Sequence, residues 1–218
     1  MVNMFSNELF EGIPFVENPV YEKIIHDIGQ QQYSIIDDFF SSETVFELRQ
    51  SLLNKYEADR FKKAAIGNRV NETIIKSIRG DHIFWIDESL SNQAELLFFE
   101  RINDLISYLN KTCFMGILQK EFHYAIYPKG TFYKRHIDTF QNDDRRKLSI
   151  VCYLNEEDWK PENGGELVLY LDDKGIEVQK VIYPFPGRFV VFESQIIEHE
   201  VKSVETERLS ITGWLKTR

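Results

Sequence analysis

The pattern of apolar and polar positions changes near the middle of the chain, from a helical period to a strand period. In the first half, apolar residues recur every three or four positions, which predicts helices over 18–32, 41–53 and 92–111. Asn18-Pro19 and the run from Ser41 to Thr44 are typical helix starts, because proline fits a first turn and serine caps one. Short apolar runs at 33–40 and 81–87 predict two strands between these helices.

From residue 121 onward the chain alternates in short runs separated by turn signals such as Asn-Gly-Gly and Pro-Gly. About eight strands joined by tight turns favour a two-sheet jelly roll, a double-stranded β-helix. We therefore expect an α+β fold in a single domain over 1–218, with a helical part at about 18–112 and a jelly-roll core at about 121–217. Two N-terminal helices should pack on the outside of one sheet. The expected strands are 121–127, 131–138, 146–154, 165–171, 175–183, 188–193, 197–201 and 207–216.

The last strand predicts where its two faces point. Leu209, Ile211 and Leu215 alternate onto one face, which can meet the helices. The opposite face, with Arg208, Ser210, Thr212 and Trp214, must then point into the roll. An inward arginine needs an anionic partner, because an unpaired buried charge is costly.

The composition of the chain limits the classes of binding partner that we expect. Hydrophobic residues make up 43% of the 218, enough for a full core, and the net charge is -9. An acidic protein lacks the lysine and arginine excess that binds a phosphate backbone, so nucleic acid is not expected as the main partner.

The chain also lacks the marks of a secreted or membrane protein. Cys113 and Cys152 are far apart in sequence, and we expect both to be reduced and buried. Residues 1–15 carry no basic region and no apolar stretch of a signal peptide, and no run is long enough to span a bilayer. A cytoplasmic protein with no membrane partner is expected, while the oligomeric state stays open.

The candidate chemistry begins at His136-Ile137-Asp138, near the end of a predicted strand. Residues two apart on a strand share a face, so an imidazole and a carboxylate would be presented together. His199, on the next-to-last strand, could add a third ligand. Two histidines and one carboxylate on one side of a metal form the facial triad of non-haem Fe(II) oxygenases, which leaves positions open for other ligands.

Each of these signals is weak by itself. His-x-Asp also arises from a surface histidine beside a solvated aspartate, and a lone histidine on an apolar strand is usually a core residue. Arg208 adds weight, since a buried guanidinium could bind the far carboxylate of a 2-oxo dicarboxylate that chelates the metal. Alone, Arg208 could equally be a surface residue beside Glu205 and Glu207. Together with the strand pattern, the oxygenase interpretation is favoured.

At these residues the chain resembles the 2-oxoglutarate/Fe(II) dioxygenase superfamily. More narrowly, it resembles the prolyl 4-hydroxylases of the hypoxia-inducible transcription factor and their single-domain bacterial relatives. The resemblance covers about residues 30–217. The stretches that carry it are IRGDHIFWI at 78–86, YPKG at 127–130, YLN at 153–155, GGEL at 164–167, HEV at 199–201 and RLSITGW at 208–214.

The resemblance implies a set of roles. His136, Asp138 and His199 would hold Fe(II), with 2-oxoglutarate and O₂ as co-substrates and ascorbate allowed as a reductant. Arg208 and Tyr153 would bind the distal carboxylate of 2-oxoglutarate, and the segment 60–77 would close over the substrate peptide. Residues implied at the co-substrate are Tyr127, Tyr153, Leu167, Arg208, Thr212 and Trp214. Residues implied at the peptide are Arg79, Asp81, Trp85 and Arg146.

Three functions remain to be separated. The resemblance implies hydroxylation of a prolyl residue in a protein, and related enzymes act on transcription and translation factors. The same oxygenase chemistry on a free amino acid or small metabolite is an alternative. A binding module that kept the jelly roll and lost turnover is a third, although every ligand position is filled. In a chain with 10 tyrosines, Tyr127 and Tyr153 could also simply be packing residues.

Overall fold

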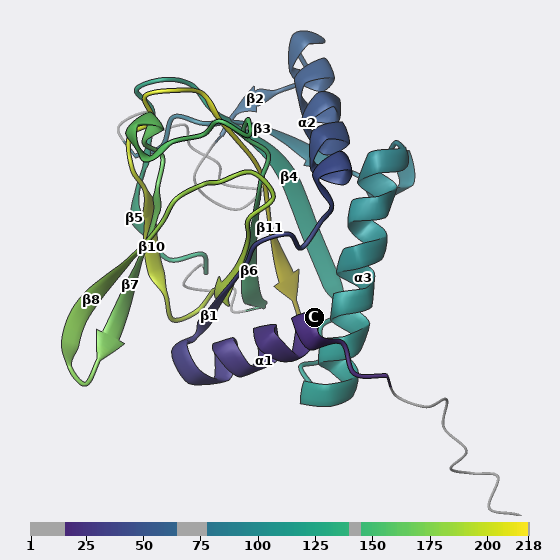
Figure 1. The fold of residues 1–218 in the computed structure, drawn as a ribbon, viewed down its shortest axis with the longest axis vertical. Helices are drawn as coiled ribbons and strands as arrows, with labels where there is room; N and C mark the ends of the chain where they lie inside the picture. The colour runs from purple at the N-terminus through teal and green to yellow at the C-terminus, as the bar shows by residue number, and fades with distance from the viewer. Residues whose placement is uncertain (1–15, 65–77, 140–144, 218) are drawn as a thin grey trace, which may run out of the picture.

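The structure of the chain is a computed structural model that describes residues 16–64, 78–139 and 145–217. The expectation about a signal peptide at residues 1–15 and most of that about the peptide-closing segment, from residue 65 onward, lie outside these ranges. Helices and strands occupy most of the rest (Figure 1).

In the described part of the first half there are three helices, close to the predicted ranges: α1 (Pro19–Gln31), α2 (Ser42–Glu57) and α3 (Gln93–Cys113). Each begins where the sequence offers a side-chain oxygen to free backbone N–H groups. Asn18 caps α1 and Ser41 caps α2, while Asn92 and Glu95 form a reciprocal capping box on α3. Helix α2 continues beyond the predicted end at residue 53, to Glu57.

The strands form two antiparallel sheets, and the fold matches the predicted jelly roll (Figure 1). The larger sheet has the order β1-β9-β6-β11-β4-β3-β2 and the smaller one β5-β10-β7-β8. The larger sheet consists of β1 (Tyr33–Ile36), β9 (Phe189–Glu193), β6 (Arg146–Tyr153), β11 (Arg208–Lys216), β4 (Gln119–Tyr127), β3 (His82–Ile86) and β2 (Lys62–Lys63). The smaller sheet consists of β5 (Tyr133–His136), β10 (Glu198–Val201), β7 (Leu167–Asp173) and β8 (Ile176–Ile182). Two short 3-10 helices, η1 (Glu88–Leu90) and η2 (Pro161–Asn163), lie in connections.

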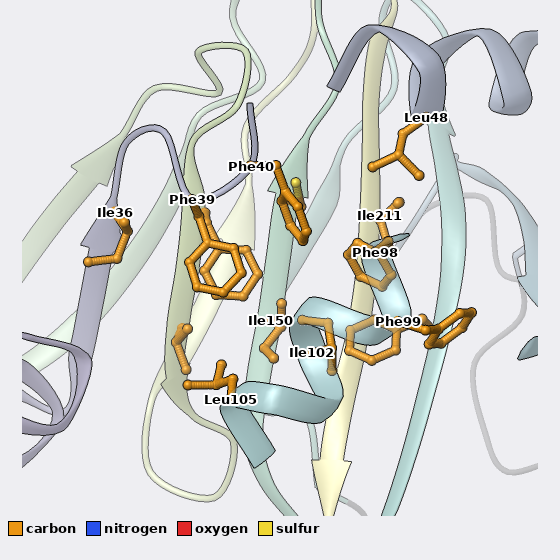
Figure 2. Close-up of a cluster of buried hydrophobic side chains, with 14 of the residues drawn as sticks. Ile36, Phe39, Phe40, Leu48, Phe98, Phe99, Ile102, Leu105, Ile150 and Ile211 are labelled. Atoms are coloured by element: carbon orange, nitrogen blue, oxygen red, sulfur yellow. The ribbon is translucent and has the colours of Figure 1, made fainter. Parts of the chain in front are cut away.

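The main hydrophobic core lies between the helices and the outer face of the larger sheet (Figure 2). All three helices contribute buried side chains to it, for example Ile24, Leu48 and Phe98. The prediction of two helices on this face was therefore one too few. Phe39, from the turn after β1, stacks on Phe189 of the sheet with ring centroids 4.0 Å apart. This layer fixes the larger sheet, so its other face is free to line the inside of the roll.

Strand β11 lies between β4 and β6, and its two faces divide as the alternation predicted. Leu209, Ile211 and Leu215 are buried in the helix-side core. Arg208, Thr212 and Trp214 line the cavity inside the roll. A single strand thus supports the core with one face and the candidate site with the other.

Several local predictions were wrong. The strand expected at 33–40 ends at Ile36, because Asp38 turns the chain with a φ of 61°. The strand expected at 131–138 ends at His136, which leaves Asp138 in the bend that follows. Strand β2 was not predicted, and Cys113 is exposed at the end of α3 rather than buried.

No helix within the described ranges is both long enough and apolar enough to cross a bilayer.

Gly213 offers a test of how tightly β11 is held against β4. A Cβ at this position would lie 2.2 Å from the carbonyl oxygen of Glu121 and from the Phe122 ring. We expect Gly213→Ala to lower the free energy of unfolding by about 1–3 kcal/mol or more, as overpacked cores do. Urea denaturation measures this.

Gly29 on the exposed side of α1 is the matched control, since a Cβ there meets nothing within 4 Å. Gly29→Ala should gain about 0.5–1 kcal/mol from helix propensity. A Gly213→Ala protein as stable as the wild type would show that the two strands can separate without cost.

Candidate active site and metal centre

Three potential metal ligands converge at one end of the roll. His136 ends β5 and His199 lies in β10, and the antiparallel pairing of these strands sets the two residues directly opposite one another. Asp138 Oδ1 lies 3.5 Å from His136 Nε2, and Asp138 Oδ2 lies 3.5 Å from His199 Nε2. Two donors that each lie about 2.1 Å from one ion at a right angle are about 3 Å apart, so these spacings suit a shared metal.

Backbone carbonyls set the orientation of both imidazoles. His136 Nδ1 lies 2.7 Å from the Lys134 carbonyl, and His199 Nδ1 lies 3.2 Å from the Ile197 carbonyl. A carbonyl can only accept, so each Nδ1 carries the proton and each Nε2 presents a lone pair toward Asp138. In both cases the carbonyl belongs to the residue two positions earlier, which links the ring orientation to strand geometry.

Asp138 lies in a bend and not on a strand, so its position is fixed by side chains from other elements and not by strand pairing. Ser149 donates to Asp138 Oδ2 at 2.6 Å and is itself 2.8 Å from Ser194, and both serines are buried. Arg146 donates to the Asp138 backbone carbonyl at 2.9 Å. Burial alone raises the pKa of this carboxyl, but the neighbouring His199 and His136 and the Ser149 hydroxyl hold the pKa well below its usual range. The carboxylate is therefore ionised and aimed at the two imidazoles.

This donor set fits Fe(II). Two neutral imidazoles and one carboxylate on one side of an ion are the ligands of the facial triad. Among the described residues, no other group of three His, Cys, Asp or Glu side chains brings its donor atoms this close together. Burial lowers the pKa of His199 to about 4, against the raising effect of Asp138, so this imidazole stays available as a ligand at neutral pH.

The three ligands open into a cavity of about 380 Å³ between the two sheets. Its apolar wall includes Val151, Leu167 and Phe192. Most of the residues proposed from the sequence line it: Arg79, Trp85, Tyr127, Arg146, Leu167, Arg208, Thr212 and Trp214. Tyr153 lies just behind the wall, and Asp81 lies outside the cavity lining.

Arg208 is a buried cation without a carboxylate partner among the described residues. Its side chain is 2% exposed, and its guanidinium carbon lies 4.9 Å from the ring centroids of both Tyr127 and Tyr153. Arg208 donates to the Ser210 hydroxyl at 3.3 Å, whereas Arg208 Nε and the Tyr153 hydroxyl have no hydrogen-bond partner. Burying such a charge costs free energy that a bound anion would offset, so the inner end of the cavity is suited to an anion.

The Arg-Gly-Asp triplet is part of the fold and not an exposed turn. Arg79 and Asp81 form a two-point ion pair, at 2.8 Å from Arg79 Nε and 2.5 Å from its Nη2, and Asp81 is 1% exposed. The Arg79 guanidinium also lies over the Tyr133 ring, 4.3 Å from its centroid. This arrangement fixes one side of the cavity beside the metal ligands.

Arg146 is similarly engaged. It pairs with Glu121 at 2.8 Å and lies over the Trp214 ring at 3.5 Å, in addition to its bond with the Asp138 carbonyl. These contacts tie the guanidinium to the metal side of the cavity. A role in contacting the substrate stays a prediction for Arg146, as it does for Trp85, which is 37% exposed at the cavity.

The structure also assigns residues to this site that the sequence did not single out. Tyr133 stacks on His136 with ring centroids 3.6 Å apart, and Ser149 and Ser194 support Asp138. His123 is buried between Trp85 and Trp214, with Nδ1 unpartnered. His123 lies four residues before Tyr127 on the same strand, so the two side chains share a face, and this could have identified His123 from the sequence. Nothing in the local sequence identifies Ser194.

Comparison with known proteins agrees with this geometry. Residues 122–216 match the family model of the 2OG-Fe(II) oxygenase superfamily. A hypoxia-inducible factor prolyl hydroxylase of Caenorhabditis elegans is 28% identical over 204 residues, which cover 89% of this chain. The match spans 28% of that longer protein.

Two solved structures share the fold along most of their length. A prolyl-4-hydroxylase of Pseudomonas putida is 33% identical with a TM-score of 0.81, covering 91% of this chain and 99% of that one. A prolyl hydroxylase of Trichoplax adhaerens, in complex with a peptide fragment of a hypoxia-inducible factor, is 28% identical with a TM-score of 0.81. That match covers 90% of this chain and 89% of the other.

Buried His123 predicts a pH dependence of stability. Burial lowers its pKa from 6.5 to about 3, so between these values the unfolded chain binds a proton that the folded protein excludes. Its contribution to stability is complete above about pH 6.5 and is lost as the pH falls toward 3. We expect His123→Leu to reduce the slope of unfolding free energy against pH by up to about 1.4 kcal/mol per pH unit in this window.

Urea unfolding at several pH values between 7 and 4 measures the slope. His26→Gln is the control, because His26 is exposed on α1. An unchanged slope in His123→Leu would mean that His123 is accessible to protons in the folded state.

Proposed function

Because this chain belongs to the 2OG-Fe(II) oxygenase superfamily, we propose that it hydroxylates a prolyl residue in a protein substrate. It is a 2-oxoglutarate-dependent dioxygenase with Fe(II) as cofactor. The observation that carries the proposal is the presence, within one cavity, of a His-Asp-His donor set and a buried arginine that has no counter-ion among the described residues. This combination supports a metal and a dicarboxylate bound side by side.

When bound, Fe(II), 2-oxoglutarate and O₂ supply the oxidation that inserts oxygen into a C–H bond and yields succinate and carbon dioxide. The protein contributes placement. His136, Asp138 and His199 would hold the metal on one side, which leaves the cavity side open. Arg208, with the Tyr153 hydroxyl, would fix the far carboxylate of 2-oxoglutarate by charge-assisted hydrogen bonds.

The surrounding side chains control water and orientation. Val151, Leu167 and Phe192 exclude water from the reacting groups, which limits side reactions. Tyr127 pairs across the sheet with Arg208 and lies beside the expected co-substrate position. Thr212 and Trp214 line the cavity and would contact the co-substrate, as the resemblance implies.

The similarity to prolyl hydroxylases supports a peptidyl proline as the substrate. One of the similar structures is a prolyl hydroxylase in complex with a peptide fragment of a hypoxia-inducible factor, which supports a protein substrate for this chain as well. We propose a translation or transcription factor as the partner of this chain and a cytoplasmic location for the reaction. Ascorbate would serve as the reductant that keeps the metal in the Fe(II) state.

One assay separates the candidate functions. Purified protein with Fe(II), 2-oxoglutarate and proline-containing peptides should form succinate and peptides carrying one added oxygen atom on proline, read by mass spectrometry. Succinate formed only with free amino acids or metabolites would assign a small-molecule oxygenase. No succinate under any of these conditions would favour a binding module.

Asp138→Ala should abolish turnover while the protein remains folded, because the variant removes the only carboxylate of the triad. Succinate formation and thermal unfolding measure the two properties. Asp158→Ala, at an exposed position, is the control and should keep full activity. Full activity in Asp138→Ala would disprove the metal assignment.

Arg208→Lys should raise the KM for 2-oxoglutarate by about tenfold or more, because lysine cannot form a two-point contact with a carboxylate. Binding of the metal alone should be unchanged. Arg101→Lys, on α3 outside the cavity, is the matched control. An unaltered KM in Arg208→Lys would remove this arginine from the co-substrate site.

A further inference from the structure

A group of positive side chains lies at the mouth of the cavity. Arg60, Lys62 and Lys63 line the cavity and are exposed, and we refer to them as the cationic rim. Lys62 and Lys63 form β2, the edge strand of the larger sheet, which Figure 1 shows away from the β7–β8 hairpin. The rim lines the same cavity as the metal ligands but comes from a different part of the fold.

The rim differs from the other cations of the cavity because its residues form no ion pair with any described residue. Arg79 is paired with Asp81 and Arg146 with Glu121. Arg60 lies over the Phe84 ring, 4.8 Å from its centroid, and has no acidic partner within the described ranges. Neither lysine of the rim has an ion pair or hydrogen bond within the described ranges.

The charge of the cavity is opposite to that of the whole chain. The protein carries a net charge of -9, yet Asp138 is the only acidic residue in the described lining of the cavity. The Asp138 carboxylate would bind the metal, and the positive charge of the metal would neutralise the negative charge of the carboxylate. The described residues at the mouth of the cavity thus present a local positive field, which attracts anionic groups and repels cationic ones.

We propose that the cationic rim is a subsite for acidic side chains of the substrate, within a few residues of the hydroxylated proline. The inference rests on the proposed function and adds to it a substrate class, a proline flanked by aspartate or glutamate. An extended peptide advances about 3.3–3.6 Å per residue, so a chain with its proline at the metal can reach the mouth of the same cavity with near neighbours.

The competing explanation is that the lysines only protect an edge strand from pairing with other chains, a common use of lysine at sheet edges. That role requires charge of either sign and predicts no preference among peptides. A subsite requires positive charge and predicts a preference that reverses when the rim is reversed.

The test uses three synthetic 15-residue peptides, each with one central proline and differing only at two neighbouring positions. These positions carry glutamate, glutamine or lysine. Hydroxylation is measured by mass spectrometry, and binding is measured separately by fluorescence anisotropy of labelled peptides with the Fe(II)- and 2-oxoglutarate-loaded protein without O₂. The wild type should prefer the glutamate peptide over the lysine peptide by about fivefold or more, and salt should reduce the preference.

The charge-reversed variant Lys62→Glu/Lys63→Glu should prefer the lysine peptide instead. This gain cannot arise from unfolding. Lys160→Glu/Lys174→Glu is the matched control, because it makes the same change in net charge at exposed positions outside the cavity and should keep the wild-type preference.

Two failures can be told apart. If the peptides bind with the predicted order but none is hydroxylated, the subsite stands and the proposed reaction fails. If the wild type and the charge-reversed variant bind all three peptides equally, the subsite is disproved, whether or not proline is hydroxylated.

Discussion

Burying the Arg208 guanidinium costs free energy that no carboxylate of the described protein offsets. The residue is nevertheless held firmly, because β11 pairs along its length with β4 and β6 and its other face is fixed in the helix-side core. The protein therefore carries a built-in requirement for an anion at the inner end of the cavity. A dicarboxylate co-substrate would meet this requirement, because one of its carboxylates would neutralise the Arg208 guanidinium when it binds.

The metal ligands depend on a different part of the fold. His136 and His199 face each other because β5 and β10 pair in one register, and a shift by one residue would turn either side chain to the opposite face. Asp138 lies beyond the strand and is oriented by Ser149 of β6 in the larger sheet, which in turn contacts Ser194 in the turn directly after β9. The metal centre thus joins the two sheets, with both histidines on one and the support for the carboxylate on the other.

Charge is arranged in layers along the cavity. The innermost cation is the one that we propose for the co-substrate, the next ones are tied to Asp81 and Glu121, and the outermost are exposed to solvent. Only the outermost layer can change partners as different substrates arrive. In the proposed function, this division would let one site hold its co-substrate firmly while weak, screened interactions at its mouth select the substrate.

The sequence by itself determined most of the helices and strands and the residues that form the candidate metal site. Alternation along 207–216 predicted which face of β11 carries Arg208 and which enters the core, because side chains in a strand point to opposite faces by geometry alone. The motif residues identified the His-Asp-His set, although the strand was expected to include Asp138. Only the tertiary structure decided the sheet order, the third helix in the core, the serines behind Asp138, the burial of His123 and the ion pairs of Arg79 and Arg146. These features depend on contacts between segments far apart in the chain, and a local pattern of polar and apolar residues contains no information about which distant segment will supply the partner.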